Sequence, residues 1–433
     1  MNILFISKDL NAGNVARLLV NEGHAVKLFI ENKHSRHNLD NMVPRVVNWR
    51  AELSWVGKEG LIVFDDTGYG KVQDRLRKQG YTVFGGSELG EKMETDREYG
   101  QEIMKKCGLK TVELHDFENM DDAAVFIKAN RDQWVVKTDN GNGKFYSYVG
   151  ELENGDDTLS LLRNYLLHSP INKKSITLHK RVHGVEIGVG RYFNGKDWVG
   201  PIEFNVEHVR FLAGDVGPAT SEMGTLAWYS SDENNKLYKE VLAKMKQVLI
   251  DADFRGDFEI NCIVNEKGAF PLEVTARIGS PIVHLHSELH DSPWGEFFYA
   301  VASGKQYDLK WKKGYGTVML MAVPPFPFSK KLKEHDFYGI RLHFRKDITK
   351  EDMKHIHFEE VALSSLEKGQ YYISDRQGYV LYVTAVGPSV EAAQKKMYAT
   401  AQKVIVPKVM YRNDIGERFK NEGEVLLKKW GYI

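Results

Sequence analysis

Cysteine is scarce in this chain, with only Cys107 and Cys262 among 433 residues. Two distant cysteines cannot build a disulfide framework or a structural zinc site, and they suit a reducing compartment. Net charge is missing too, because Lys plus Arg and Asp plus Glu both number 59. This balance argues against a general nucleic-acid binder and against a protein that works on membrane surfaces.

Long apolar runs and targeting signals are also absent. No segment approaches the ~20 apolar residues of a membrane span, and "MNILFISKDL" lacks the basic region and apolar length of a signal peptide. We therefore expect a cytoplasmic protein that acts on small molecules, without nucleic-acid or membrane partners, as a monomer or homodimer. The apolar content of 42% is ordinary for a globular protein.

Strands and helices alternate over the first 88 residues. "NILFIS" reads as a strand, "NVARLLVNEG" as a helix, and "GLIVFDD" and "YTVFG" as further strands. This order is typical of a parallel sheet covered by helices. We predict a doubly wound, Rossmann-like domain over residues 1–88. A nicotinamide-dependent dehydrogenase is disfavoured, since no G-x-G-x-x-G follows the first strand.

The rest of the chain predicts mixed α/β and α+β structure in further domains. One helix is expected from Leu89 to Lys106, followed by a smaller strand-rich subdomain at about 111–180. That subdomain is expected to belong to a second domain, residues 89–310. A strand-rich C-terminal domain is expected over residues 311–433.

The stretch "PLEVTARIG" carries Glu273, Thr275 and Arg277 at alternate positions of an otherwise apolar run. Alternation places these three side chains on one face of a strand and the apolar ones on the other. Such a face is either the solvent side of an outermost strand or the floor of a polar site.

The segment before it predicts a hairpin with the turn "NEKG", which sets Asn261 opposite Glu273. Glu259 shares their face. Oxygen ligands converging from two strands suit Mg²⁺, which takes one or two carboxylates and completes its shell with phosphate and water. The pattern leaves open whether Glu259 or Asn261 faces the metal, and a solvent-facing polar pair is the plain alternative.

A second candidate feature is Lys137 at the end of a strand that runs into "TDNGNGK". Gly141 and Gly143 allow backbone N–H groups to approach an anion, so this turn can form a phosphate-covering flap. A hairpin with an exposed Asn-Gly turn is the alternative. The segment is not a P-loop, because G-x-x-x-x-G-K-[ST] is absent.

Together these parts resemble the ATP-grasp superfamily and, within it, the phosphoribosylamine–glycine ligases of purine biosynthesis. The most specific segment is "EHVRFLAGDVGPATSEMG", similar to that family's D-H-K-R-x-x-x-x-D-x-G-P-N-T-G-G-M-G loop. "YVLYVTAVG" and "YRNDIGERF" resemble two further stretches of those ligases. The resemblance extends from about Gly85 to Phe419.

The resemblance implies a role for each matching residue. Contacts to ATP are expected from Arg97, Lys137, Gly141, Gly143, Lys144, Lys180, Val182 and Glu186. Substrate contacts are expected from His208, Arg210, Asp215, Gly217, Pro218, Thr220 and Arg277, with Lys137, Asp215 and Arg277 catalytic. Mg²⁺ or Mn²⁺ is expected at Glu273, with Asn261, Glu259 and Thr275 as further candidate ligands.

The implied activity is an ADP-forming, ATP-dependent carbon–nitrogen ligase that joins glycine or another small amino acid to an amine through an acyl phosphate. Some positions depart from the family pattern. Thr275 replaces a metal-binding asparagine, Glu222 replaces a loop glycine, and the turn "SKDLNAGN" lacks the family's G-G-R-E-H. A catalytically reduced paralogue that senses nucleotide or acts as a partner subunit is the alternative.

Overall fold

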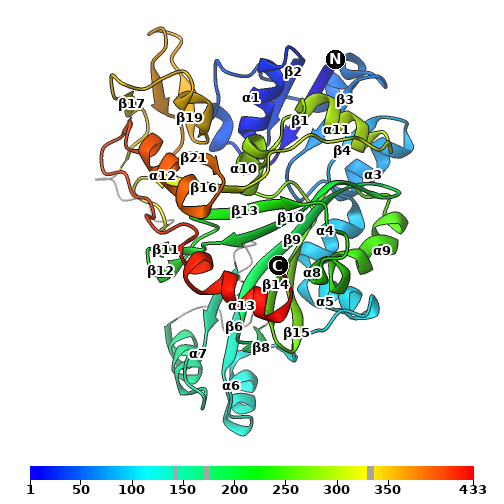
Figure 1. Cartoon of the computed structure of the whole chain (residues 1–433), viewed down its shortest axis with the longest axis vertical. Coiled ribbons are helices and arrows are strands. Elements are labelled where there is room, and N and C mark those ends of the chain that lie inside the picture. The colour runs from blue at the N-terminus through cyan, green and yellow to red at the C-terminus, as the bar shows by residue number, and fades with distance from the viewer. Residues whose placement is uncertain (140–144, 169–175, 329–335) are drawn as a thin grey trace.

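The computed structural model describes residues 1–139, 145–168, 176–328 and 336–433. Its N-terminal part is a parallel four-stranded sheet in the order β2-β1-β3-β4 (Figure 1). The strands are β1 (Asn2–Ser7), β2 (Ala25–Ile30), β3 (Leu61–Phe64) and β4 (Thr82–Phe84), with α1 (Gly13–Asn21) and α3 (Gly70–Lys78) between them. This arrangement confirms the doubly wound sheet predicted for the start of the chain.

Two helices lead out of this sheet where the sequence predicts one. They are α4 (Glu88–Thr95) and α5 (Arg97–Lys106). The prediction of a single helix is wrong because Asp96 has an extended backbone and caps α5, its carboxylate accepting a hydrogen bond from the N–H of Tyr99. Asp is a preferred residue at the N-cap of a helix.

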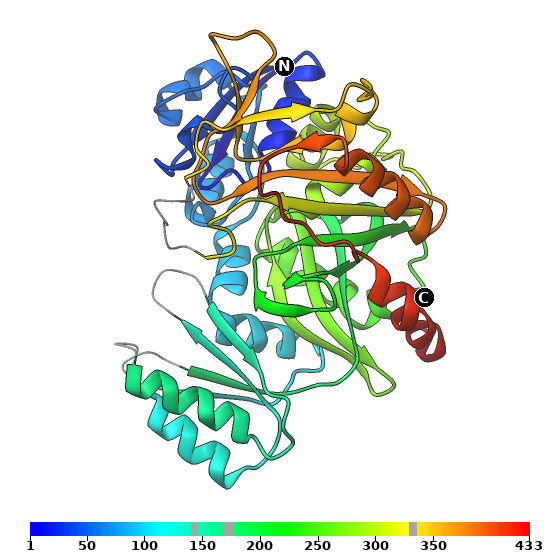
Figure 2. The same ribbon diagram turned by 90° about the vertical axis from the view of Figure 1, so that its left-hand side faces the viewer.

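A small antiparallel sheet in the order β5-β8-β6-β7 comes next. Its strands are β5 (Leu114–Phe117), β6 (Trp134–Asp139), β7 (Phe145–Val149) and β8 (Ile176–Lys180), and its helices are α6 (Met120–Ala129) and α7 (Asp156–His168). Trp134 and Ile127 centre a separate apolar cluster beneath it. In Figure 2 this unit projects from the lower end of the molecule.

The largest element is an eight-stranded sheet in the order β15-β14-β9-β10-β13-β16-β21-β18. Its strands are β9 (Val185–Asn194), β10 (Trp198–Glu207), β13 (Gly224–Ser230), β14 (Arg255–Asn265), β15 (Gly268–Thr275), β16 (Tyr315–Ala322), β18 (Ile356–Phe358) and β21 (Tyr379–Gly387). Because β16 pairs with β13, the sheet continues across residue 311. A separate domain from that residue onward stays a prediction.

The remaining helices and strands complete the fold. They are η1 (Ser35–His37), η2 (Trp49–Glu52), α2 (Leu53–Val56), β11 (Arg210–Leu212), β12 (Val216–Ala219), α8 (Lys236–Glu240), η3 (Leu242–Met245), α9 (Lys246–Asp251), α10 (Ile282–Leu289), α11 (Trp294–Ala302), β17 (Arg341–Phe344), η5 (Asp352–His355), β19 (Val361–Leu363), β20 (Tyr371–Ile373), α12 (Val390–Ala401), β22 (Val404–Ile405), η6 (Phe419–Gly423) and α13 (Glu424–Trp430). Both cysteines are free thiols. In the described part of the chain, every helix is too short or too polar to cross a membrane.

Candidate active site

One face of the large sheet is polar, and strand alternation explains how it forms. On β10 and β14 the apolar residues Phe204, Phe258 and Ile260 enter a core cluster. The residues between them therefore share the opposite face. That face carries Glu203, Asn205, Glu207, Asp257, Glu259 and Asn261. A row of acids and amides on a largely buried surface is typical of the base of a binding site, and we call this face the polar floor.

The register of β14 and β15 agrees with the hairpin expected from the sequence. Asn261 pairs with Glu273, and Glu259 pairs with Thr275. The turn joins Asn265 to Gly268. The four candidate metal ligands are therefore neighbours on adjacent strands.

Glu273 faces two cationic side chains from other parts of the chain. Arg97, at the start of α5, lies with its terminal nitrogen 3.7 Å from Glu273 Oε2. Lys137 on β6 interacts electrostatically with both, and burial, followed by the repulsion of Arg97, lowers its pKa to about 8. The Glu273 side chain is 52% exposed. Arg97 of α5, Lys137 of β6 and the exposed carboxylate of Glu273 on β15 thus lie close together at the edge of the polar floor.

Further carboxylates lie behind Glu273. Glu207 Oε1 accepts a 2.9 Å hydrogen bond from Asn261 Nδ2. Burial raises the pKa of Glu207 to about 7, with added repulsion from Glu186 and Glu273. Burial also raises the pKa of Glu186. Sequence reasoning missed Glu207, although the alternation in "IEFNVE" placed it on the same face as Glu203 and Asn205.

The donors at this place fit a hard divalent cation. Glu259 is 6% exposed and Oε1 of its carboxylate already accepts a 2.7 Å hydrogen bond from Asn205 Nδ2. Glu273 is the accessible carboxylate, next to the amide of Asn261. Within the described ranges, no three His, Cys, Asp or Glu side chains form a ready-made metal cage. An exposed carboxylate that lies among other acids suits a divalent cation, because the cation offsets their mutual repulsion and still binds phosphate oxygens and water.

The structure describes only some of the other residues that are expected to contact ATP. Gly141, Gly143 and Lys144 lie outside the described residues. Lys180 ends β8 with its Nζ 2.6 Å from Asp132 Oδ2, and Val182 follows in the short link to β9. Their contacts with ATP stay predictions.

Arg277 is held by a residue that sequence reasoning did not select. Its Nε donates to Glu94 Oε1 at 2.9 Å, and the N–H of Ala276 donates to the other oxygen of Glu94 at the same distance. Glu94 and then Asp66 are the charges that raise the pKa of Arg277. Arg277 therefore joins the end of β15 to α4 and to the N-terminal sheet. A role toward substrate stays a prediction.

The two segments most similar to the ligase pattern pack against each other. Asp215, at the tip of the β11–β12 hairpin, accepts a 2.8 Å hydrogen bond from Arg412 and a 3.2 Å one from Arg418. Arg412 also binds Asp414 through two nitrogens. His208 is fully buried, and its Nε2 accepts a hydrogen bond from the N–H of Gly416.

Other residues that are expected to contact substrate form hydrogen bonds that stabilise this hairpin. Arg210 donates to the carbonyl of Gly217 at 3.1 Å, and the hydroxyl of Thr220 donates to the carbonyl of Val209 at 2.8 Å. Pro218 lies within β12. Burial lowers the pKa of His208 to about 4, so its ring is neutral at pH 7. The hairpin is thus built by the same residues that are expected to bind substrate, and that binding role stays a prediction.

Comparison with known proteins supports the resemblance. Residues 95–282 match the family model "Phosphoribosylglycinamide synthetase, ATP-grasp (A) domain". The phosphoribosylamine–glycine ligase of Clostridium acetobutylicum is 24% identical over 398 residues, covering 89% of this chain and 90% of that protein. In structure, the phosphoribosylamine–glycine ligase of Thermotoga maritima superposes with a TM-score of 0.70 at 19% identity, covering 96% of this chain and all of that one.

The chain has the ATP-grasp fold. A biotin carboxylase from Campylobacter jejuni shares this fold at a TM-score of 0.63 and 10% identity, covering 100% of this chain and 97% of that one. The resemblance predicted from the motifs is confirmed, and with it the fold class. The chain is thereby similar to ADP-forming, ATP-dependent carbon–nitrogen ligases, a group that uses ATP and a divalent metal.

Proposed function

We propose that this ATP-grasp protein activates the carboxylate of glycine or another small amino acid with ATP and joins it to an amine, releasing ADP and phosphate. The observation that carries the proposal is the convergence of Arg97, Lys137 and Glu273 on the polar floor. The β11–β12 hairpin, which keeps the family's pattern, supports a small amino acid as the carboxylate substrate. We also propose that this enzyme works in the cytoplasm.

The reaction divides into two balanced steps. A carboxylate oxygen of the amino acid forms a bond to the γ-phosphorus of ATP, and ADP leaves. The amine nitrogen then bonds to the acyl carbon, the bond to phosphate breaks, and the nitrogen gives up its extra protons. No covalent bond to the protein is needed.

The protein's part is to neutralise charge and align the reactants. Lys137 and Arg97, which both interact with Glu273, provide positive charge for phosphate oxygens. Glu273 and Asn261 would hold Mg²⁺, which when bound supplies positive charge at the phosphates. These oxygen donors suit Mg²⁺ and Mn²⁺ alike.

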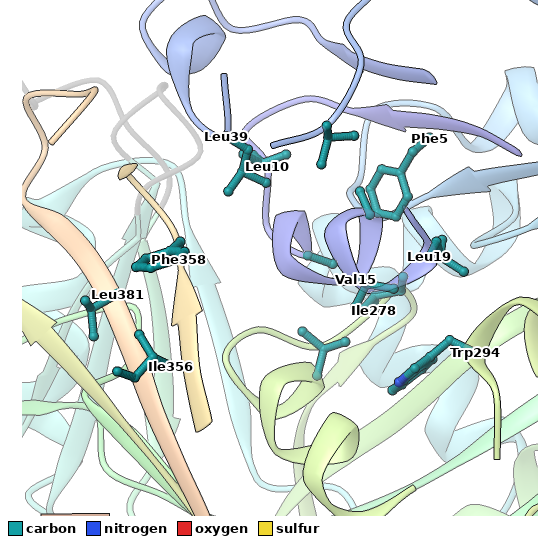
Figure 3. Close-up of a cluster of buried hydrophobic side chains, with 14 of the residues drawn as sticks. Phe5, Leu10, Val15, Leu19, Leu39, Ile278, Trp294, Ile356, Phe358 and Leu381 are labelled. Carbon is teal, nitrogen blue, oxygen red and sulfur yellow. The ribbon is translucent and has the colours of Figure 1, made fainter. Parts of the chain in front are cut away.

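The acceptor amine differs from phosphoribosylamine in this proposal. A phosphate usually binds backbone N–H groups at a helix start, and here the start of α1 is covered. Leu10 and Leu39 are completely buried and lie side by side there (Figure 3). A Cβ added to Gly13 would sit 2.6 Å from Leu10 Cγ and 3.0 Å from Leu39 Cδ1. No room for a phosphate is left at that glycine.

The same turn already has an internal hydrogen-bond acceptor. Asp65 Oδ2 accepts a 2.9 Å hydrogen bond from the N–H of Ala12. Asn14, 2% exposed, donates its amide to the ring of His357 at 2.7 Å. The Ala12 N–H and the Asn14 amide, two groups that could bind phosphate, are therefore used within the fold.

A screen of amino acids against phosphorylated and unphosphorylated amines, read by ADP release, tests the proposal. Hydroxylamine added with ATP and the true amino acid is expected to trap a hydroxamate. A protein that binds ATP but releases no ADP with any pair, and yields no hydroxamate, would instead be a nucleotide sensor or partner subunit.

A further inference from the structure

A cavity of about 380 Å³ lies where the end of β2 meets the C-terminal strands. Its lining comes from residues 33–37 after β2, residues 325–328 after β16, Tyr338, and residues 374–379 between β20 and the start of β21. A cavity of this volume has the size of a site for one small organic molecule. None of these segments carries a residue of the polar floor, so the cavity is separate from the candidate ATP site.

Positive charge dominates the accessible lining of this cavity. Lys33 and His34 are exposed, and neither side chain has a hydrogen-bond or ion-pair partner among the described residues. Arg376 is 47% exposed and gives only its Nε to Asp336, at 3.0 Å. Asp375 is the one acid among the described lining residues; it is 4% exposed and already accepts the backbone N–H of Arg376. Such donors suit a phosphate, which has several acceptor oxygens and pairs well with a guanidinium.

Aromatic rings form another accessible part of the lining. Phe328 is 65% exposed and Tyr338 is 41% exposed. The guanidinium of Arg376 lies over the Tyr338 ring, 4.5 Å from its centre. Phe328 has no ring contact with another described residue, so its face is available. An aromatic face beside phosphate-binding cations is the combination that binds a nucleotide, because the base stacks on the ring while the cations hold the phosphate.

An inner wall separates the cavity from the reaction site. Phe326 of the lining is 4% exposed, and its ring centre lies 5.7 Å from that of Phe211 on β11. The hydroxyl of Tyr379, also in the lining, lies 2.9 Å from Ser221 Oγ. Burial raises the pKa of the next residue, Glu222, and acids of the polar floor add to the effect. A molecule in the cavity therefore lies behind the loop that faces the floor, as a ligand additional to the reactants.

We propose that this cavity binds a nucleoside monophosphate. Lys33, His34 and Arg376 hold the phosphate, and the base stacks on Phe328. Because the cavity wall is hydrogen-bonded to the loop expected to bind the amino acid, the nucleotide acts as an effector. This inference goes beyond the proposed ligase function and does not depend on it, since binding requires no turnover.

Calorimetric titration of the full-length protein tests the inference. The ATP site is first filled with Mg²⁺ and an excess of a non-hydrolysable ATP analogue, which keeps other nucleotides from the polar floor. The probes are AMP, adenosine, which lacks the phosphate, and ribose 5-phosphate, which lacks the base. AMP is expected to bind more tightly than either of the other two.

Two substitutions test the two halves of the site separately. Lys33→Gln is expected to weaken binding of AMP and ribose 5-phosphate roughly tenfold, the usual loss for one charged hydrogen-bonding partner, and to leave adenosine binding unchanged. Phe328→Ala is expected to weaken binding of AMP and adenosine roughly five- to a hundredfold, as the loss of one stacked base does, and to leave ribose 5-phosphate binding unchanged. Both variants are expected to fold, because both side chains are exposed.

Lys350→Gln is the matched control, since this lysine is exposed and lies outside the lining. It is expected to bind every probe as the wild type does. Absence of AMP binding overturns the inference, and so does adenosine or ribose 5-phosphate binding as tightly as AMP. Unchanged AMP binding in Lys33→Gln or in Phe328→Ala, or an equal loss in Lys350→Gln, also overturns it. All of these outcomes leave the ligase function untouched, because that function is read by ADP release.

Discussion

Arg97 and Glu273 form an ion pair at 3.7 Å that connects the start of α5 to β15. The two residues carry the charges that a metal-bound triphosphate requires, one for phosphate oxygens and one for the metal. In the structure each neutralises the charge of the other.

Glu273→Gln is expected to abolish turnover and leave the fold intact. The amide keeps the volume of the carboxylate and removes the charge that the metal needs. Arg97, whose side chain is 17% exposed, loses a 3.7 Å ion-pair contact, but the Glu273 side chain itself is 52% exposed and its charge is not needed to fill the core. The measurement is ADP release at limiting Mg²⁺, with circular dichroism for the fold.

The neighbouring ligands provide the comparison. Asn261→Ala and Glu259→Gln are expected to reduce the rate less, since their side chains are 6% exposed and already hydrogen-bonded. Retention of most of the wild-type rate by Glu273→Gln would refute the metal assignment.

We expect Lys137 to set the pH dependence of kcat/KM for ATP. Burial lowers its pKa from 10.5 to about 8, so the side chain is charged below this pH and neutral above it. The kcat/KM for ATP reports the free enzyme and is expected to fall as pH rises through about 8. Lys137→Arg keeps its charge and is expected to move this fall to higher pH. An identical profile in both proteins would assign the titration to another group.

The effect on folding has the opposite sign. A lysine whose pKa is lowered in the folded state binds fewer protons there than in the unfolded chain. The free energy of unfolding therefore gains from Lys137 as pH rises from about 8 toward 10.5. Urea unfolding of wild type and Lys137→Met across this range measures the gain, which the variant is expected to lack.

The sequence predicted the arrangement of β14 and β15 because alternation and a four-residue turn determine it locally. Asn261 and Glu273 therefore lie opposite each other as predicted, and their role at a metal stays a prediction. Glu94 and Glu207 were missed, since their importance comes from contacts with residues more than 50 positions away, Arg277 and Asn261. The break at Asp96 was missed because a capping aspartate inside a polar helical pattern resembles a surface residue.

Arg412 is expected to be essential for stability, whereas Arg418 is not. Arg412 is 2% exposed and binds Asp215 and Asp414. Its removal leaves Asp414 without its guanidinium partner and leaves Asp215 with Arg418 alone, so we expect a loss at the lower end of the ~3–5 kcal/mol typical of a broken buried ion pair. Urea unfolding of Arg412→Met measures this loss. Arg418→Gln, whose side chain is 41% exposed, is expected to lose under ~1 kcal/mol. Equal losses would contradict the buried role of Arg412.

Phosphoribosylamine is expected to be a poor acceptor. With freshly generated phosphoribosylamine and glycine, kcat/KM is expected below the ~10⁴ M⁻¹s⁻¹ usual for natural substrates. The physical reason is the covered start of α1, where Leu10 lies against Gly13. Efficient turnover would show that phosphate binds elsewhere.

ADP and phosphate are the expected products with every accepted pair of substrates. Attack on the γ-phosphoryl group leaves ADP, whereas attack at the α-phosphorus would leave AMP and pyrophosphate. Chromatography of the reaction mixture separates the two cases. Detection of AMP would exclude an acyl phosphate.

The pairing of β13 with β16 has a consequence for dissecting the chain. A fragment that stops near residue 310 would lack β16, β18 and β21 and expose the free backbone of β13 along its length. Unpaired strands of this kind attach to other copies of themselves. An ATP-binding half prepared by truncation would therefore aggregate, and fragments that restore binding would have to be co-expressed so that β16 can complement β13.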